Sequence, residues 1–395
     1  MSIYARVEEV KVLGIETSCD ETAAAVVEDG TRVISDVVNS QIDIHARYGG
    51  VVPEVAARSH IEVINAVIDE AVREAGGWDS IDAIAVTYAP GLIGSLMVGT
   101  LAARTLAITK NKPLYPVHHI ESHIYANWLG SDVGVSNSVT QEAVAGVTTP
   151  ASRTQEDATR NDALAPSSVL LGTDVAKPVF PVLALVVSGG HTQLILLRGH
   201  GDFEIIGTTR DDAVGEVFDK VAKMIGLPYP GGPSISKAAL NGDRTRYKLP
   251  KAKLDTPYDF SFSGLKTAVL RAVQAEVGKD FTFPSSELPG LLSEAKRDDF
   301  AASFEKTAVD TLVDKLLLAY NAYQPGAVVI AGGVSANQYL RKQITERIPI
   351  RVDFPALKYC TDNGAMVASA GYFHTLRLAP TDPYNLEVTP HLKLT

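Results

Sequence analysis

The same order of predicted strands and helices occurs twice along the chain, and this duplication limits the possible folds more than any single motif does. In the first half, apolar runs and helical spacing predict strands at 11–16, 22–28 and 31–38, a helix at 53–74, a strand at 81–87, a helix ending near 107, a strand at 114–117 and a helix opening near 119. The second half predicts strands at 182–187, 192–197 and 203–207, a helix at 299–320, a strand at 327–331, a helix at 335–347, a strand at 351–354 and a helix from about 362. Each half therefore has the order βββαβαβα.

Three antiparallel strands followed by two parallel strand–helix units describe the α/β ribonuclease-H-like fold. Two copies facing each other across a cleft describe the two-lobed architecture shared by actin, the sugar kinases and the heat-shock chaperone ATPases. The sequence thus predicts one actin-like lobe at 1–130 and a second at 179–395, with an inserted subdomain at about 228–292. Residues 131–178 are rich in Ser, Thr, Ala and Asp without an apolar period, which predicts a disordered insertion. The functional site is expected in the interlobe cleft.

Composition excludes several classes of protein. Of 395 residues, 46% are hydrophobic and 21% charged, which is typical of a globular protein with a large core. The net charge of -10 disfavours coating nucleic acid by bulk electrostatics, so an RNA substrate would need a local basic patch or a partner. The two cysteines, Cys19 and Cys360, are interpreted as small buried residues. No apolar run approaches the ~18 residues of a membrane span, and the first residues have no signal-peptide core. We therefore expect a soluble, cytoplasmic protein.

Two histidines open the last helix of the first half. His119 and His123 lie about 40° apart on one helix face, so both imidazoles can reach one metal ion; two unrelated histidines are the alternative. The duplication pairs this helix with the one that starts near Asp362, which is either that helix's N-cap or a third ligand. Two nitrogens and one carboxylate oxygen suit Zn(II) or Fe(II) and leave positions open for substrate.

A zinc-protease interpretation lacks its central residue. In such enzymes the catalytic glutamate directly follows the first histidine of the helix. Here Glu121 follows His119 by two positions, about 200° around the helix, and is expected to point away from the metal.

Two strand-turn-strand corners, Thr17–Glu21 and Ser188–His191, should face each other in the cleft, where their amide groups can hold an anion; plain hairpin turns are the alternative. Asn337 follows a strand and a pair of glycines, and it is either a nucleotide contact or a helix cap. Asp219 is either a ribose acceptor or a solvated charge.

Charged side chains could also contribute to the site. Acidic side chains that could line the cleft are Asp20, Glu21, Asp211, Asp212, Glu216 and Asp219. A basic stretch could contact RNA or be a solvated loop, and it contains Arg244, Arg246, Lys248, Lys251 and Lys253.

Six ordered motifs together resemble one family. They run from Gly14 to Thr22, Gly50 to His60, His119 to His123, Val187 to Thr192, Phe260 to Lys266 and Ala331 to Asn337. The chain closely resembles the bacterial TsaD family of tRNA N6-adenosine threonylcarbamoyltransferases, once described as O-sialoglycoprotein endopeptidases. The resemblance covers nearly the whole chain except the first ten residues and the segment 131–177.

The resemblance implies transfer of L-threonylcarbamoyl from threonylcarbamoyl-AMP to N6 of the adenosine 3′ to the anticodon, in tRNAs reading codons that begin with A. It implies that His119, His123 and Asp362 bind one iron or zinc ion, and that Asp20 and Glu21 support activity. Implied substrate and nucleotide contacts are Val186, Val187, Ser188, Gly189, Gly190, Asp219, Gly232 and Asn337. Some members have an acidic residue where this chain has Ser236, so a contact there is in doubt.

The resemblance also implies a TsaB-like heterodimer partner, a TsaE-like ATPase and a TsaC-like synthase that makes the adenylate. The rival hypotheses are an actin-like ATPase or kinase, a metallopeptidase, and a scaffold without catalysis.

Overall fold

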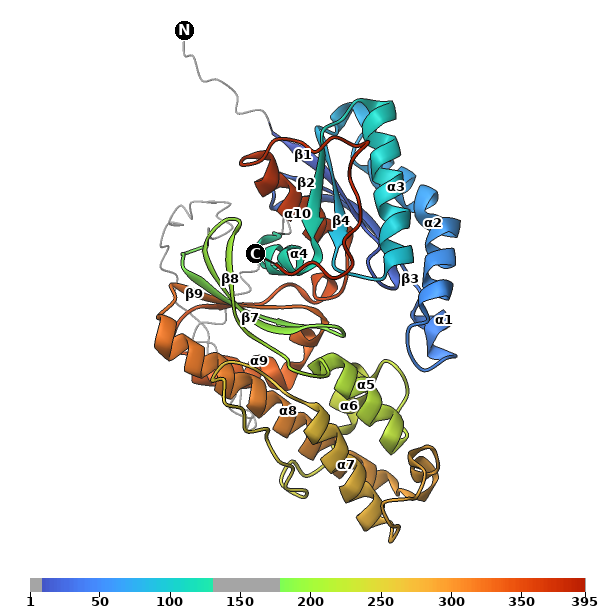
Figure 1. The fold of residues 1–395 in the computed structure, drawn as a ribbon, viewed down its shortest axis with the longest axis vertical. Coiled ribbons are helices and arrows are strands. Elements are labelled where there is room, and N and C mark those ends of the chain that lie inside the picture. Colours follow the sequence, from blue (N-terminus) through green and yellow to red (C-terminus); the bar gives the residue numbers. More distant parts are fainter. Residues whose placement is uncertain (1–8, 131–177, 395) are drawn as a thin grey trace, which may run out of the picture.

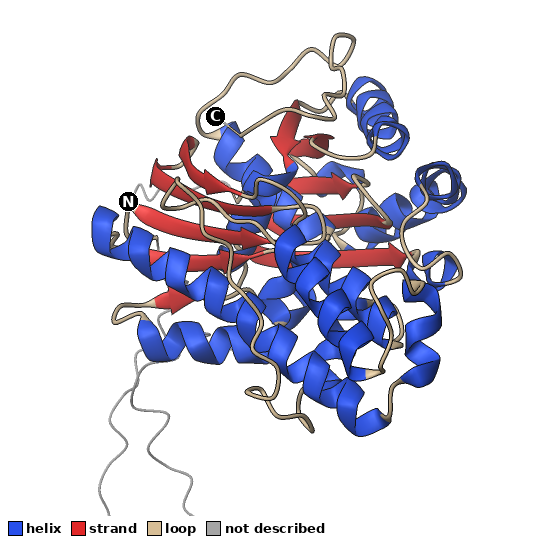
Figure 2. Ribbon diagram, turned by 60° about the horizontal axis from the view of Figure 1, so that its bottom comes forward, coloured by secondary structure: helices blue, strands red, loops and turns tan. Residues whose placement is uncertain are grey.

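The computed structural model describes residues 9–130 and 178–394, which form two five-stranded sheets of the same topology (Figures 1 and 2). The first sheet has the order β3 (Arg32–Ser40), β2 (Glu21–Glu28), β1 (Lys11–Glu16), β4 (Ala83–Ala89), β5 (Leu114–His118). The second has the order β10 (Val352–Asp353), β9 (Ala327–Ala331), β6 (Val182–Val187), β7 (Thr192–Gly199), β8 (Asp202–Thr208). In each sheet the first three strands in sequence pair antiparallel and the other two pair parallel. The predicted duplicated fold is confirmed.

Both sheets are covered on two faces, so their central strands β1 and β6 are almost entirely buried. Helices α2 (Pro53–Glu74) and α3 (Ile93–Lys110) cover the outer face of the first sheet, and α8 (Glu294–Tyr323) and α9 (Gln338–Arg347) pack in the outer core of the second lobe. Alternate residues of one strand serve different cores. Leu13 packs under α2 and α3, whereas Val12 faces the centre of the molecule.

The last helix of each half lies between the two sheets. Helix α10 (Gly364–Thr375), from the second half, packs against β1, β2 and β4 of the first sheet, while α4 (His119–Tyr125), from the first half, contacts β6 and β9 of the second. Figure 1 shows both helices at the centre of the molecule. Glycines permit the close approach of α10. A Cβ at Gly14 would lie 2.3 Å from the backbone of both Ala368 and Gly364. Because each of these two helices packs against the sheet of the other half, the starts of α4 and α10 lie close together.

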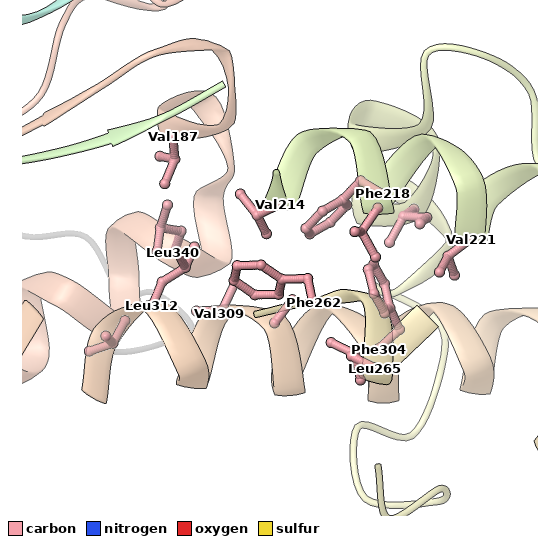
Figure 3. Packing of buried hydrophobic residues seen from close by; sticks show 14 of the residues in the cluster. Val187, Val214, Phe218, Val221, Phe262, Leu265, Phe304, Val309, Leu312 and Leu340 are labelled. Carbon is pink, nitrogen blue, oxygen red and sulfur yellow. The ribbon is translucent and has the colours of Figure 1, made fainter. Parts of the chain in front are cut away.

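The second lobe carries additional helices, α5 (Val214–Ile225), α6 (Gly231–Ala238) and α7 (Ser263–Glu276). Figure 3 shows how they are held: apolar side chains of α5 and α7 pack onto α8. The rings of Phe218 on α5 and Phe304 on α8 meet edge to face, with centroids 4.9 Å apart. This packing gives α5 a fixed position beside the cleft.

Several bounds differ by a few residues from the sequence-based ranges, and three helices of the second half differ in ways that have a physical explanation. Helix α8 begins at Glu294, five residues before 299, because Ser293 caps it. Helix α9 begins at Gln338, after a short 3-10 turn at Gly333–Ala336. Helix α6 was not predicted, since its first residues are two glycines and a proline. Pro233 lies in the first turn, where the missing N–H costs little. The predicted insertion, apart from residue 178, lies outside the described residues.

Residues 376–394 return along the first lobe. The Arg104 guanidinium donates to the carbonyls of Pro383, Tyr384 and Leu386, and the amide of Thr389 donates to the carbonyl of Tyr88. The described segment ends beside α4 (Figure 1), where Leu394 is buried in the central core. Within residues 9–130 and 178–394, none of the helices has the length and hydropathy needed to cross a bilayer.

Candidate metal centre and interlobe cleft

The structure brings His119, His123 and Asp362 into one cluster between the sheets. Their ligand atoms all lie within 4.8 Å of one another. Nε2 of His123 is 3.1 Å from Oδ1 of Asp362, and Nε2 of His119 is 3.6 Å from the same oxygen. The two histidine rings have centroids 4.6 Å apart. Three residues that are far apart in sequence thus form one triad.

The triad fits a metal ion. His123 is fully buried, yet within the described residues neither of its ring nitrogens has a hydrogen-bond partner. An unsatisfied buried polar group costs about 1–3 kcal/mol, and a cation between Nε2 and the carboxylate would remove that cost. Two imidazoles and one carboxylate with open positions form the donor set typical of non-haem Fe(II), and they also suit Zn(II).

Glu16 orients the first histidine. Its Oε2 lies 3.2 Å from Nδ1 of His119, and the Ser18 hydroxyl is 3.1 Å from the same nitrogen. A carboxylate on one imidazole nitrogen directs the other nitrogen toward a metal. The sequence analysis missed Glu16, although a fully buried acid ending an apolar strand is a usable signal.

Asp362 does not cap its helix. Asn363 is the N-cap of α10, because its Oδ1 accepts from the amide of Met366 at 2.8 Å. The Asp362 carboxylate therefore remains available to face the histidines, and of the two roles considered for it the cap is excluded.

Charge in the triad favours a cation. Burial opposes protonation of His119, but the carboxylates of Asp362 and Glu16 outweigh it and raise the pKa of His119 to about 9. Burial also favours the neutral acid at Asp362, yet the charge of His119 and His123 outweighs it and lowers the pKa of Asp362 to about 2. Both shifts have the same cause, since the carboxylates and imidazoles of this cluster favour positive charge between them.

Glu121 points away from the triad. Its Oε1 is 3.0 Å from Nε2 of His374 on α10, and both side chains are buried. The geometry agrees with the expectation from helical spacing and gives no support to a protease arrangement.

The two predicted corners are present as turns between β1 and β2 and between β6 and β7. The corner between β6 and β7 is closed by the amide of Ser188 donating to the carbonyl of His191 at 2.8 Å. Cβ atoms added at Gly189, Gly190 or Gly232 would meet nothing within 4 Å, so these backbones face open space. At the other corner, Cys19 is only partly buried, which corrects the expectation of a buried residue.

Acidic groups from both lobes approach one another there. Burial, with Asp362 and Asp20 close by, raises the pKa of Glu21 well above its usual range. Burial also raises the pKa of Asp219, with Asp20 contributing. Tyr229, which the sequence analysis did not single out, lies near the same carboxylates. Burial and the negative charges of Asp20 and Asp219 raise its pKa.

Two of the predicted nucleotide contacts also have structural roles. Asp219 accepts from the amide of Gly231 at 2.6 Å and so supports the start of α6. Asn337 is the N-cap of α9, as its Oδ1 accepts from the amide of Leu340 at 2.8 Å. The Asn337 amide nitrogen donates to Ser236 and to Glu305, which was also missed. The cap considered for Asn337 is therefore present.

Other acidic side chains considered for the cleft have partners within the second lobe. Asp211 accepts from the hydroxyls of Ser261 and Ser263, and Asp212 pairs with Lys220 and Lys266.

Glu216 also pairs with Lys220, 2.7 Å away. In the basic stretch, Arg244 pairs with buried Glu305 at 2.6 Å and Lys251 pairs with Asp314 at 2.7 Å. These two cations are already engaged within the protein.

Fold and site define the class: a two-lobed actin-like protein with a two-histidine, one-aspartate centre in its cleft. The family model for TsaD, tRNA N6-adenosine threonylcarbamoyltransferase, matches residues 32–171 and 167–369. The chain belongs to this family, as the resemblance of its motifs implied.

Curated relatives agree with the family model. A tRNA N6-adenosine threonylcarbamoyltransferase from Thermomicrobium roseum is 45% identical over 97% of this chain and 96% of the relative. One from Bacillus subtilis is 43% identical over 98% of this chain and 97% of the relative. The transferase interpretation is confirmed, and the kinase and peptidase alternatives are not favoured.

Among solved structures, HypF from T. kodakarensis is similar with a TM-score of 0.53 and 12% identity, over 93% of this chain and 48% of that chain. That likeness concerns the fold alone.

Proposed function

We propose that this chain transfers L-threonylcarbamoyl from threonylcarbamoyl-AMP to N6 of the adenosine 3′ to the anticodon, in tRNAs reading codons that begin with A. The observation that carries the proposal is the His119, His123 and Asp362 triad, which lies beside the glycine-bearing corner at 188–191 in a chain of the TsaD family. A metal at the triad would be Fe(II), with Zn(II) as the alternative, and it supplies Lewis-acid polarisation of a carbonyl oxygen when bound.

The chain's own groups would divide the remaining work. Amides of the corner at 188–190 would hold the phosphate and the developing negative charge on the carbonyl oxygen. Asp219, Gly232 and Asn337 would position the nucleotide, and the ends of β6 at Val186 and Val187 would support the corner. As adenosine N6 bonds to the carbonyl carbon, the carbon–oxygen bond to phosphate breaks and AMP leaves with the electron pair. The proton from N6 would pass to Glu21, whose pKa is raised by burial and by the charges of Asp362 and Asp20.

The test is transfer to unmodified tRNA in a mixture of the chain, its TsaB-like and TsaE-like partners and threonylcarbamoyl-AMP, scored by mass spectrometry of nucleosides. We expect the modified adenosine only in tRNAs that read A-starting codons. Glu21→Gln should lower the rate by roughly 100-fold, the low end for general-base catalysis, while AMP binding persists. Steady ATP hydrolysis by the chain alone, without tRNA modification, would favour the kinase-like alternative.

A TsaB-like partner would dock on α3. The inner face of α3 buries Leu96 together with small residues that include Gly99 and Ala103, and several other large apolar side chains of the helix are exposed. Four of them are exposed by 42–61% and follow helical spacing: Ile93, Met97, Leu101 and Ile108. Ile61 on the adjacent α2 is exposed by 64%. Exposed apolar side chains that gather on one face in this way are typical of a protein interface.

Leu101→Glu should weaken the heterodimer by at least about 30-fold, because a charge at the centre of an apolar interface costs about 2 kcal/mol or more. Isothermal titration of one purified protein with the other measures the affinity of the heterodimer. Leu240→Glu is the matched control, since Leu240 is 79% exposed on the other lobe. Equal affinities for the two variants would place the partner elsewhere.

A further inference from the structure

We propose that Glu305 is a positioning residue for the donor nucleotide. It fixes the side-chain amide of Asn337 so that a nucleotide meets the oxygen of this amide and not its nitrogen. Glu305 lies on α8 and is 1% exposed. The inference rests on the proposed function, because that function makes Asn337 a nucleotide contact.

Three helices of the second lobe meet at Glu305. Helix α8 packs against both α6 and α9 (Figure 1). Oε1 of Glu305 accepts from Nδ2 of Asn337 at 2.8 Å, and the same nitrogen donates to the hydroxyl oxygen of Ser236 on α6 at 2.9 Å. Ser236 follows Gly232 by one helical turn, so both lie on one face of α6. The Asn337 amide is therefore held where the proposed nucleotide contacts of α6 and α9 come together.

The charge of Glu305 is balanced by Arg244. Nη1 of Arg244 lies 2.6 Å from Oε2 of Glu305, and the guanidinium lies over the ring of Tyr339, 3.9 Å from its centroid. A buried carboxylate needs such a partner, since an unpaired buried charge is strongly unfavourable. Arg244 thereby engages one carboxylate oxygen and leaves the other to Asn337.

Contacts at both ends of the Asn337 amide select one orientation. Oδ1 accepts from the amide of Leu340 at 2.8 Å, as the N-cap of α9. An ionised carboxylate has no hydrogen to donate, so the amide nitrogen must face Glu305. A flipped amide would set its oxygen against the carboxylate and its nitrogen against the N–H of Leu340. Glu305 and the helix cap thus favour the same orientation.

This orientation decides what Asn337 offers to a ligand. The two hydrogens of Nδ2 are engaged by Ser236 and Glu305. The amide oxygen has two lone pairs, and the N–H of Leu340 takes one of them. Asn337 can therefore accept a hydrogen bond from a nucleotide, but both of its hydrogens are already used. Its partner on the nucleotide must carry a hydrogen, as the ribose hydroxyls and the 6-amino group of adenine do.

The first experiment measures binding of AMP, IMP, 2′-deoxy-AMP and 3′-deoxy-AMP to the metal-loaded full chain by titration calorimetry. IMP has an oxygen in place of the 6-amino group, and each deoxy analogue lacks one hydroxyl. Wild type should bind one or more analogues roughly fivefold more weakly than AMP, as expected for one hydrogen bond.

Glu305→Gln should lose this preference for one of the analogues, which identifies the group from which Asn337 accepts. The physical reason is that the single amide oxygen of a glutamine cannot accept from both Arg244 and Asn337. A merely structural role for Glu305 would weaken AMP and the analogues alike. Preferences that all survive in Glu305→Gln, or a wild type that binds the four nucleotides equally, overturn the proposal.

Asp314→Asn is the matched control. Asp314 also lies on α8 and also joins the inserted subdomain to α9, through Lys251 at 2.7 Å and Arg347 at 2.6 Å. Its contacts are with these two cations and not with Asn337, so the variant should keep the wild-type preferences. The same loss of preference in Asp314→Asn and Glu305→Gln would assign the effect to general helix packing and overturn the proposal.

A double variant provides a second test, which also decides the matter if Glu305→Gln alone does not fold. Asn337→Asp keeps an oxygen for the helix cap, but it sets two carboxylates against each other, so binding should weaken. In the double variant Glu305→Gln, Asn337→Asp, the amide at 305 can accept from Arg244 and donate to the carboxylate at 337. The preference lost in Glu305→Gln should then return. A double variant that shows no such preference contradicts the proposal.

Transfer to tRNA by the wild-type chain reports on the proposed function separately. A chain that modifies tRNA while Glu305→Gln keeps every preference loses only the role of Glu305. A chain that modifies no tRNA, but whose nucleotide preference depends on Glu305, fails the proposed function alone.

Discussion

His123→Ala should remove the bound metal and lower threonylcarbamoyl transfer by at least about 1,000-fold, while the chain remains folded. Loss of Lewis-acid polarisation costs several kcal/mol, and each ~1.4 kcal/mol is a factor of ten in rate. The fold should tolerate the change, because the ring of His123 approaches only the Asp362 carboxylate, at 3.1 Å from Nε2, and neither ring nitrogen makes a hydrogen bond within the described residues. Elemental analysis of the protein and the tRNA-modification assay measure the two effects.

His119→Ala should have the same effect on transfer, with a larger cost in stability, since His119 also contacts Glu16 and Ser18. His374→Gln is the matched control. His374 is equally a buried histidine, but it contacts Glu121 rather than the triad, so metal content and transfer should persist. Full transfer by a metal-free, folded His119→Ala chain would exclude the metal from the mechanism.

Gly14→Ala should destabilise the protein by about 3 kcal/mol or more, the upper end for overpacking. The added Cβ would lie 2.3 Å from two backbone atoms of α10, and backbone cannot move aside as a flexible side chain can. Helix α10 would have to shift away from β1, and Asp362 precedes that helix, so metal binding should weaken too. Thermal unfolding followed by circular dichroism should show a melting temperature lower by roughly 5 °C or more.

Gly264→Ala is the control for this substitution. Gly264 lies in α7 with nothing within 4 Å of an added Cβ, so stability should stay the same or rise by up to about 1 kcal/mol. If both glycine variants melt with the wild type, the close packing of α10 on β1 does not contribute to the fold as described.

Strands and helices with an uninterrupted pattern were predictable to the residue. The bounds of α2, β6 and β9 match the sequence-based ranges, because apolar spacing and flanking turn residues act locally. Helix α6 was missed because its opening residues usually mark a turn. It forms through a tertiary contact, the carboxylate of Asp219 on the Gly231 amide. The domain boundaries and the site roles stay predictions.

Some side-chain roles could be predicted from local spacing, and others depend on contacts between distant residues. The spacing of His119 and His123 indicates a shared face, and that of Glu121 an opposite one, without knowledge of the fold. Whether Asp362 or its neighbour caps α10 depends on which side chain reaches the amide of Met366, and the structure shows Asn363. The contacts of Glu16 and Glu305 likewise join residues more than 30 positions apart.

By itself, the sequence determines the duplicated order of elements, the two-histidine helix and the family, because each depends on patterns within short stretches or on their repetition. Only the tertiary structure decides that α10 crosses to the first sheet and α4 to the second, which places Asp362 within 3.1 Å of His123. It also decides that the C-terminal segment lies beside the triad. These outcomes depend on close packing between distant segments, where an added methyl at Gly14 or a shifted helix changes which groups meet.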